Sequence, residues 1–375
     1  WMEPGQTMGT TWFDDLYLGV EPDGPNLLAD PGFEATPDDV KVTIDWTEWD
    51  RQAAKYLDDY HFTSFVLPVM GLGGGRYPNY DPGRFGPFKF GTPDYERLMG
   101  DYLMELQNHL EEKGWLKKAY IYWYDEPGEE DYDFVVERMK LIKRLAPKLT
   151  RMLTEQPEPP LYGAVDLWCP VLSNYSPEVL HARQKEGDRV WWYVCCGPRA
   201  PWLGLFIDHP HTDMRAWLWA TWKWNVEGCL IWTTTWWTCG GLFGEKYQNP
   251  WEDPMSYTAD SKPGAVGYWG NGDGRFLYPP NRRAWQDQET KYIEGPVDCY
   301  RWEQLRDGID DYEYLWMLRE AISKQPNSAA AKKARALLEV PAAVMGEDAT
   351  QFSHQPLPML EHRHRVAEAL EALSK

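Results

Sequence analysis

Two adjacent acids, Asp125 and Glu126, follow an aromatic run and stand directly before Pro127. The run, residues 119–124, reads Ala-Tyr-Ile-Tyr-Trp-Tyr, and aromatic and β-branched residues favour a buried strand. Proline cannot continue a central strand, so the acids fall at the carboxyl end of this one. Two carboxyls, one protonated and one ionised, are the groups that glycoside hydrolysis usually requires.

The surrounding sequence alternates short aromatic or β-branched runs with charged stretches at helical spacing. We predict strands near 62–68, 119–125, 149–154, 165–169, 190–195, 228–234 and 274–278, and helices near 47–60, 94–113, 131–146, 176–186, 212–224 and 303–324. Such β-then-α units favour a parallel sheet, and about eight of them a closed barrel. We therefore expect an α/β fold of the (β/α)8 TIM-barrel type, with one strand not identified and the acids at the end where barrel active sites lie.

Three segments differ in composition. Residues 1–40 are punctuated by Gly, Pro and Asp and predict the edge of an accessory β-sandwich. Residues 41–325 carry the barrel pattern, with a long Gly/Pro/Trp-rich loop over 235–300 that we expect to be functional. Residues 326–375 predict closing helices. Because the first residue is Trp1 and no signal-peptide pattern follows, we expect the chain to be part of a longer one.

Charge and composition exclude several classes of partner. The 58 acids and 38 bases give a net charge of -20, and the bases are scattered, which argues against nucleic acid and anionic membranes. No apolar run approaches the ~20 residues that span a bilayer, so we expect a soluble protein. The 22 Trp and 22 Tyr exceed what packing requires and are the rings that line sites for sugars.

Other chemistries lack their signatures. The glycine-rich 71–75 has no phosphate-loop Lys-Ser/Thr, and no Gly-x-Ser-x-Gly is present. The two His pairs, at 209/211 and 362/364, have no third ligand. The six cysteines show no C-x-x-C spacing, so we interpret them as buried free thiols. We predict neither a metal nor an organic cofactor.

Six motifs occur in an order that resembles the catalytic domain of glycoside hydrolase family 123. They are residues 124–127 (Tyr-Asp-Glu-Pro), 165–170, 190–195, 228–232, 272–279 and 301–315. The resemblance spans about residues 40–320. It implies a (β/α)8 barrel that acts as a retaining exo-β-N-acetylgalactosaminidase without a cofactor. It also implies that Asp125 and Glu126 act in a substrate-assisted reaction on a glycan or glycoconjugate.

The spacing of the acids agrees with such a reaction. Neighbouring side chains of a strand point to opposite faces, so Asp125 and Glu126 can share a pocket only if the backbone bends. They cannot easily flank a sugar ring at the ~6.5–9.5 Å separation of inverting enzymes. In this interpretation the 2-acetamido group is the nucleophile, Asp125 orients it and Glu126 is the acid/base. The alternative is that the acids only cap a helix starting near Asp131.

Five further residues are candidates for sugar binding. Tyr193 would donate to the acetamido oxygen, Trp232 would stack on the sugar, and Trp168 would wall off the acetamido methyl. Asp273, between two glycines, would bind hydroxyls, and Tyr278 belongs to the same motif. Core packing for the rings and an Asx turn for Asp273 remain alternatives. The charged residues at 301–311 favour an ion-pair network that closes the barrel.

Two other functions stay open. One is a β-N-acetylglucosaminidase, or another retaining glycosidase whose substrate has no acetamido group. The other is a carbohydrate-binding protein without catalysis that has kept the aromatic pocket.

Overall fold

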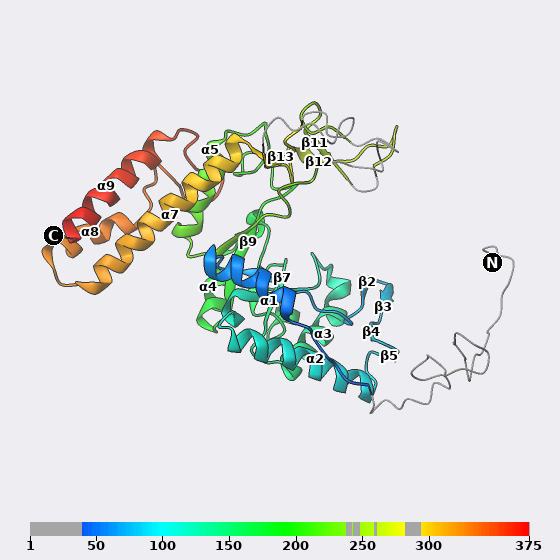
Figure 1. Cartoon of the computed structure of the whole chain (residues 1–375). Coiled ribbons are helices and arrows are strands. Elements are labelled where there is room, and N and C mark those ends of the chain that lie inside the picture. The colour runs from blue at the N-terminus through cyan, green and yellow to red at the C-terminus, as the bar shows by residue number, and fades with distance from the viewer. Residues whose placement is uncertain (1–39, 238–241, 243–247, 259–260, 282–293, 375) are drawn as a thin grey trace, which may run out of the picture. The chain divides into compact units, whose positions relative to one another are not determined.

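The structure is a computed structural model that describes residues 40–237, 242, 248–258, 261–281 and 294–374 (Figure 1). The chain divides into two compact units. The first comprises Trp1–Tyr120 and Leu141–Leu149, and the second comprises Ile121–Lys140 and Thr150–Lys375. The predicted segment 1–40 lies, except for its last residue, outside the described residues, so its sandwich stays a prediction.

A six-stranded sheet is the central feature, with the order β1-β6-β7-β8-β9-β10. Its strands are β1 (Phe65–Val66), β6 (Ala119–Tyr122), β7 (Thr150–Leu153), β8 (Leu167–Trp168), β9 (Arg189–Tyr193) and β10 (Gly228–Leu230). The registers of β1/β6, β7/β8, β8/β9 and β9/β10 are parallel. Because neighbours in the sheet follow one another along the chain, their carboxyl ends lie at one edge. The predicted α/β fold is confirmed to this extent, and closure into an eight-stranded barrel stays a prediction.

Most predicted elements are present, but the strand predicted at 274–278 is wrong as a member of the sheet. Only Leu277–Tyr278 (β13) is extended, and it pairs antiparallel with β14 (Val297–Asp298). The cause is local, since Gly272 and Gly274 have φ values of 82° and 68°. These left-handed turns leave two extended residues before Pro279.

The first unit is built around the helix α2 (Pro93–Glu112). Thr92 caps it by accepting from the Tyr95 amide at 3.4 Å, and Pro93 occupies the first turn, where no amide donor is needed. Leu98, Leu103 and Leu110 are among its buried residues. The unit also contains α1 (Thr47–Ala54) and two small hairpins, β2 (Gly74–Arg76) with β3 (Asn79–Asp81) and β4 (Arg84–Phe85) with β5 (Phe88–Lys89).

The second unit carries the other long helices. Its helices are α3 (Tyr132–Leu145, which ends in the first unit), α4 (Pro177–Lys185), α5 (Thr212–Lys223), α7 (Tyr300–Lys324), α8 (Ala329–Ala334) and α9 (Leu357–Leu373). α5 and α7 pack against each other and α9 packs against α7 (Figure 1). A hairpin of β11 (Met255–Tyr257) and β12 (Tyr268–Asn271) precedes α7.

A buried carboxylate joins three of these helices. Asp311 of α7, 1% exposed, accepts from the Arg215 guanidinium at 2.6 and 2.9 Å and from the Trp219 indole at 2.8 Å, both on α5. Arg363 of α9 donates to it at 3.2 Å. The ion-pair network predicted for this stretch is therefore present. Arg301, at the start of the same stretch, donates to the carbonyl oxygens of Leu205, Gly272 and Arg275.

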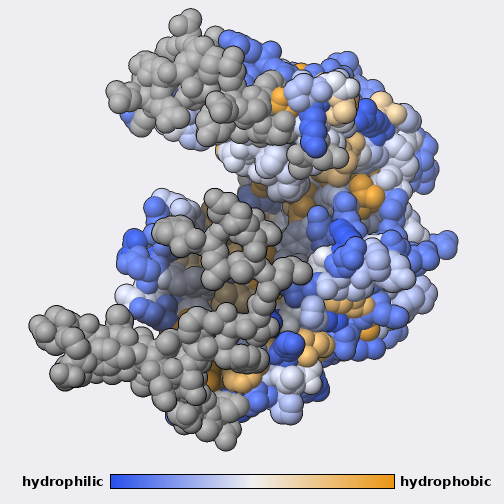
Figure 2. Space-filling view, turned by 90° about the vertical axis from the view of Figure 1, so that its right-hand side faces the viewer, coloured by the Kyte–Doolittle hydropathy of each residue, from blue (hydrophilic) through white to orange (hydrophobic). Residues whose placement is uncertain are grey.

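The surface is mostly polar. In the face seen in Figure 2, hydrophilic residues predominate and hydrophobic ones appear in small groups. Within the described part of the chain, no helix combines the length and the apolar composition that crossing a bilayer would require.

Candidate active site

Asp125 and Glu126 lie just past the end of β6, and both are exposed. Glu126 has a φ of 42°, in the left-handed region, which costs a non-glycine residue about 1–2 kcal/mol. The backbone bend that a shared pocket requires is therefore present, and it is centred on Glu126. A strained residue beside a second acid at a strand end is a feature of functional sites.

The hydroxyl of Thr154 holds this turn in place. Thr154 directly follows β7, is 4% exposed, and accepts from the Glu126 amide at 2.8 Å. The same hydroxyl donates to Asp125 Oδ1 at 2.9 Å, and the Tyr122 hydroxyl donates to the same oxygen. One buried side chain thus contacts both acids, and it provides a partner for an amide that the turn takes out of the sheet.

Tyr193 reaches the second acid from the end of β9. Its hydroxyl donates to Glu126 Oε1, and its ring is 7% exposed. Burial, together with the Glu126 carboxylate, raises the pKa of Tyr193. The phenol therefore stays protonated and acts as a donor.

Glu155 adds a third carboxyl at this edge of the sheet. It follows Thr154 and is half-buried. Burial raises its pKa to about 7, and the nearby Glu158 and Glu126 carboxylates act in the same direction. A carboxyl that titrates near neutrality beside two others is a pattern of acid–base sites.

Asp273 approaches the same region from the loop before β13. It is 2% exposed, and burial raises its pKa to about 6 against the opposing effect of the Gly274 amide, Arg301 and Arg275. Its carboxylate and that of Glu126 both raise the pKa of Cys196. Asp273, Cys196 and Glu126 are therefore close enough to interact electrostatically.

A cluster of three indoles lies beside Asp273. Trp232 is 44% exposed, and its ring centroid lies 4.8 Å from that of Trp269 and 5.1 Å from that of Trp236. A Cβ on Gly274 would lie 3.0 Å from the Trp232 ring. The exposed indole is thus next in space to the Asp273 loop, as stacking on a ligand would require.

Trp168 and Tyr278 have other partners. Trp168 has 0% exposure and its indole donates to Asp188 at 2.7 Å. In this structure it fits the packing alternative. The Tyr278 ring lies 4.9 Å from Trp251.

Sequence reasoning missed Thr154, Glu155 and Tyr122. A signal was present, because the predicted strand 149–154 ends at Thr154, and the ends of neighbouring parallel strands meet at one edge. The interpretation of the cysteines as buried is right for Cys169 and wrong for Cys196, which is exposed. Cys239 lies outside the described residues.

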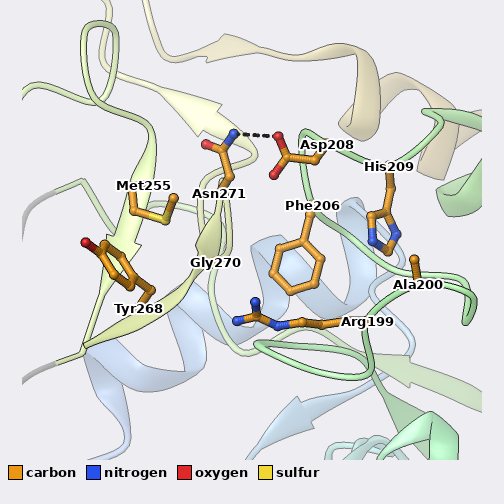
Figure 3. A pocket seen from close by; sticks show the side chains of 9 residues that line it. All are labelled: Arg199, Ala200, Phe206, Asp208, His209, Met255, Tyr268, Gly270 and Asn271. Carbon is orange, nitrogen blue, oxygen red and sulfur yellow. Dashed lines mark hydrogen bonds between the residues drawn. The ribbon is translucent and has the colours of Figure 1, made fainter. Parts of the chain in front are cut away.

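A pocket of about 500 Å³ lies in the same unit as the site. Figure 3 shows Tyr268 and Met255 on one side of it and Arg199 and Phe206 on the other. Asn271 donates to Asp208 at 3.1 Å between these sides. Along the chain, Asn271 is two residues from Asp273 and Arg199 is three residues from Cys196. The complete lining is Arg199, Ala200, Phe206, Asp208, His209, Met255, Tyr268, Gly270 and Asn271.

The side-chain groups of the site are those used in acid–base chemistry. Carboxyls, a phenol and a hydroxyl converge at the ends of β6, β7 and β9. Across the described residues, no three His, Cys, Asp or Glu side chains are arranged to hold a metal ion.

A family model decides the classification. Residues 83–318 match the model of the glycoside hydrolase 123 catalytic domain. The chain belongs to glycoside hydrolase family 123.

A solved structure agrees with this at the level of fold. The chain is similar to a family 123 glycoside hydrolase from Clostridium perfringens, solved to study glycolipid glycan hydrolysis, with a TM-score of 0.52 and 16% identity. The match covers 89% of this chain and 56% of that one, so the chain spans little more than half of its relative. A protein from Silicibacter pomeroyi named for glycerophosphoryl diester phosphodiesterase activity matches with a TM-score of 0.20 and 16% identity, over 35% of this chain and 40% of that one. No curated protein matches.

Proposed function

We propose that this family 123 chain is a retaining exo-β-N-acetylgalactosaminidase. It would remove terminal β-linked N-acetylgalactosamine through an oxazoline intermediate, with Glu126 as acid/base and Asp125 as the residue that orients the acetamido group. We also propose that its sheet is part of a (β/α)8 barrel, because its strand order follows the chain.

The observation that carries the proposal is the single hydroxyl of Thr154 on both acids, 2.8 Å from the Glu126 amide and 2.9 Å from Asp125 Oδ1. Adjacent acids held to one anchor cannot lie on opposite faces of a sugar ring. Retaining enzymes with an enzyme nucleophile place their carboxyls ~5–5.5 Å apart across the bond, whereas substrate-assisted glycosidases need no second carboxyl as nucleophile. The acid pair therefore favours a nucleophile that belongs to the substrate.

The reaction has two steps. In the first, the acetamido oxygen attacks the anomeric carbon, the glycosidic bond breaks, and Glu126 gives its proton to the leaving oxygen. Asp125 accepts from the acetamido N–H and balances the positive charge of the oxazolinium. In the second, Glu126 takes a proton from water, which attacks the anomeric carbon and reopens the ring with net retention.

Other residues would bind the sugar and its leaving group. Trp232 offers an exposed ring for stacking and Asp273 a carboxylate for hydroxyls, while Tyr193 positions the Glu126 carboxyl. We expect the part of the substrate beyond the cleaved bond to enter the pocket beside β12, where the exposed ring of Tyr268 offers a stacking surface.

A panel of 4-nitrophenyl glycosides tests the proposal. We expect turnover of the β-N-acetylgalactosaminide, slower turnover of the β-N-acetylglucosaminide, and none of the β-galactoside, which has no acetamido nucleophile. A thiazoline analogue of the intermediate should inhibit far better than N-acetylgalactosamine, since it resembles the cyclised state. A β-galactoside cleaved as fast as its acetamido counterpart, or a fluorosugar trapped covalently on either acid, overturns the mechanism.

The rival is binding without catalysis, which the exposed Trp232 also favours. If no glycoside in the panel turns over while N-acetylgalactosamine quenches tryptophan fluorescence with saturation, the chain is a binding protein and the proposal is wrong.

A further inference from the structure

Two adjacent thiols, Cys195 and Cys196, follow β9 by one residue and lie beside the candidate active site. Their Sγ atoms are 3.7 Å apart, and both thiols are free. Successive side chains of a strand point to opposite faces, so this approach needs a turn. The Cys195 amide donates to the Gly197 carbonyl at 2.8 Å, which closes the backbone here.

The pair lies within electrostatic range of two carboxylates of the site. Asp273 acts electrostatically on both thiols, and Glu126 acts on Cys196. Tyr193, two residues before Cys195, donates to Glu126. A group bound to both sulfurs is therefore within electrostatic range of the Glu126 carboxyl.

The two sulfurs differ in their ionisation. The hydrogen bond from Cys195 lowers the pKa of Cys196 to about 7, although burial and the two carboxylates oppose this. The same hydrogen bond and burial raise the pKa of Cys195. Near neutrality the pair holds one thiolate, which is the nucleophile, and one thiol that donates to it.

We propose that Cys195 and Cys196 form a bidentate site for thiophilic electrophiles that bond two sulfurs through one atom, of which trivalent aryl arsenicals are the matching class. The two Sγ atoms lie 3.7 Å apart, which is close enough for one arsenic atom to bond both. A tetrahedral metal ion would require further ligands, and the described residues offer no group of three. An aryl arsenical supplies its third bond from its own ring carbon.

The step balances without an oxidant. The arsenic–oxygen bond of an aryl arsenoxide breaks, two arsenic–sulfur bonds form, and the two thiol protons leave with the oxygen as water. A disulfide is the less favourable product, because adjacent Cα atoms are ~3.8 Å apart and disulfides prefer 4.4–6.8 Å.

Phenylarsine oxide and intact-protein mass spectrometry test the site. We expect one equivalent to add to the protein with loss of one water, to resist excess 2-mercaptoethanol, and to leave on addition of 2,3-dimercaptopropanol. Cys195→Ser and Cys196→Ser should each abolish the monothiol-resistant adduct. Cys299→Ser, the control on another partly exposed thiol at the start of α7, should keep it. Absence of an adduct on the wild-type protein, or its persistence in both single variants, overturns the proposal.

A second measurement tests the position of the site, and this part rests on the proposed function. Hydrolysis of the nitrophenyl N-acetylgalactosaminide should fall in proportion to arsenical occupancy and return with the dithiol. Full occupancy with unchanged turnover overturns the placement beside the working carboxyl. The mass measurement is independent of turnover, so it decides the thiol site even if the chain proves to have no hydrolase activity.

Discussion

Glu126 combines an exposed carboxyl with a left-handed backbone, and the two are connected. A φ of 42° is unfavourable for glutamate, so its neighbours must stabilise it. The Thr154 hydroxyl accepts its amide and the Tyr193 hydroxyl donates to its carboxyl. Because the amide and the carboxyl of Glu126 are both hydrogen-bonded, its side chain loses little freedom when a substrate binds. This favours proton transfer in a fixed geometry.

The first prediction concerns this carboxyl. Glu126→Gln keeps an oxygen that accepts from Tyr193 but removes the transferable proton, so we expect a rate loss of about 10²–10⁴-fold on a disaccharide with a poor leaving group. Nitrophenyl substrates should lose less in the first step. Steady-state kinetics on both substrates measures this. A variant within a few-fold of wild type on the disaccharide would show that Glu126 is not the acid.

Asp125→Asn should fail differently. The amide preserves the shape but cannot balance a positive oxazolinium, so the loss should persist with an activated leaving group. We expect normal folding by circular dichroism and a large fall in kcat on all 2-acetamido substrates. The two variants should be compared over leaving groups of graded pKa. If good leaving groups restore the activity of Asp125→Asn but not that of Glu126→Gln, the two residues have each other's role.

The raised pKa of Asp273 predicts that KM depends on pH. Burial raises its pKa from 3.8 to about 6, so it is a carboxylate above pH 6 and becomes neutral as the pH falls below it. If the carboxylate binds sugar hydroxyls, KM should rise as the pH falls through about 6, by up to about tenfold per pH unit. Asp273→Asn should have a high KM that varies little over this range. An identical pH profile of KM in both proteins contradicts the assignment.

At the scale of elements, the candidate site lies along one edge of the sheet, and several elements contribute residues to it. The ends of β6, β7 and β9 supply the acids, the Thr154 anchor and Tyr193, and a loop after the hairpin of β11 and β12 supplies Asp273. β12 also separates two environments. Trp269 packs on Trp232, while its neighbours Tyr268 and Gly270, together with Asn271, line the pocket.

Tyr268→Ala tests the pocket. The ring is 58% exposed, so its removal should cost little stability. Loss of a stacking surface for the leaving sugar should raise KM several-fold for an oligosaccharide and leave the kinetics of the nitrophenyl glycoside unchanged. Tyr300→Ala, an exposed tyrosine that is not in the pocket lining, is the control. Equal effects on both substrates would show that the leaving sugar does not bind in the pocket.

Asp311 tests the packing of α5, α7 and α9. Removal of one partner of a buried ion pair costs about 3–5 kcal/mol, and without Asp311 the Arg215 guanidinium keeps only the more distant Asp307, at 3.7 Å. We expect Asp311→Ala to lower the free energy of unfolding by that amount in urea titrations. Asp310→Ala changes the exposed neighbour and should stay within about 0.5 kcal/mol of wild type. Equal small losses in both would mean that the network contributes little.

At the scale of the whole molecule, charge and family membership restrict the partners. A net charge of -20 with scattered bases opposes binding to polyanions. Residues 83–318 carry the match to the family 123 model, and they contain all of the residues proposed to act on the substrate. The helices α8 and α9 lie beyond this range and contribute through packing, as Arg363 does by its bond to Asp311.

The sequence by itself determined the positions of the six strands of the main sheet and of the helices α1–α5 and α7, the place of Asp125 and Glu126 at a strand end, and the family. It missed the hairpin of β11 and β12, which lies in the stretch 235–300 predicted as mostly loop. These depend on local properties: aromatic and β-branched runs favour strands, helical spacing favours helices, and Pro127 ends the strand. The predicted strand at 274–278 failed because short left-handed turns at Gly272 and Gly274 override the aromatic pattern around them.

Only the tertiary structure decided which side chains meet. Thr154 is 28 residues from Glu126 in the chain, and Tyr193 is 67 residues from it. Their contacts depend on the register of neighbouring strands. The same holds for Trp168, whose place in the core follows from packing on both faces of β8 rather than from its own residue type. Nothing in the order of residues shows that Cys196 lies within electrostatic range of Glu126 and Asp273, because that proximity arises when the ends of distant strands and a late loop come together.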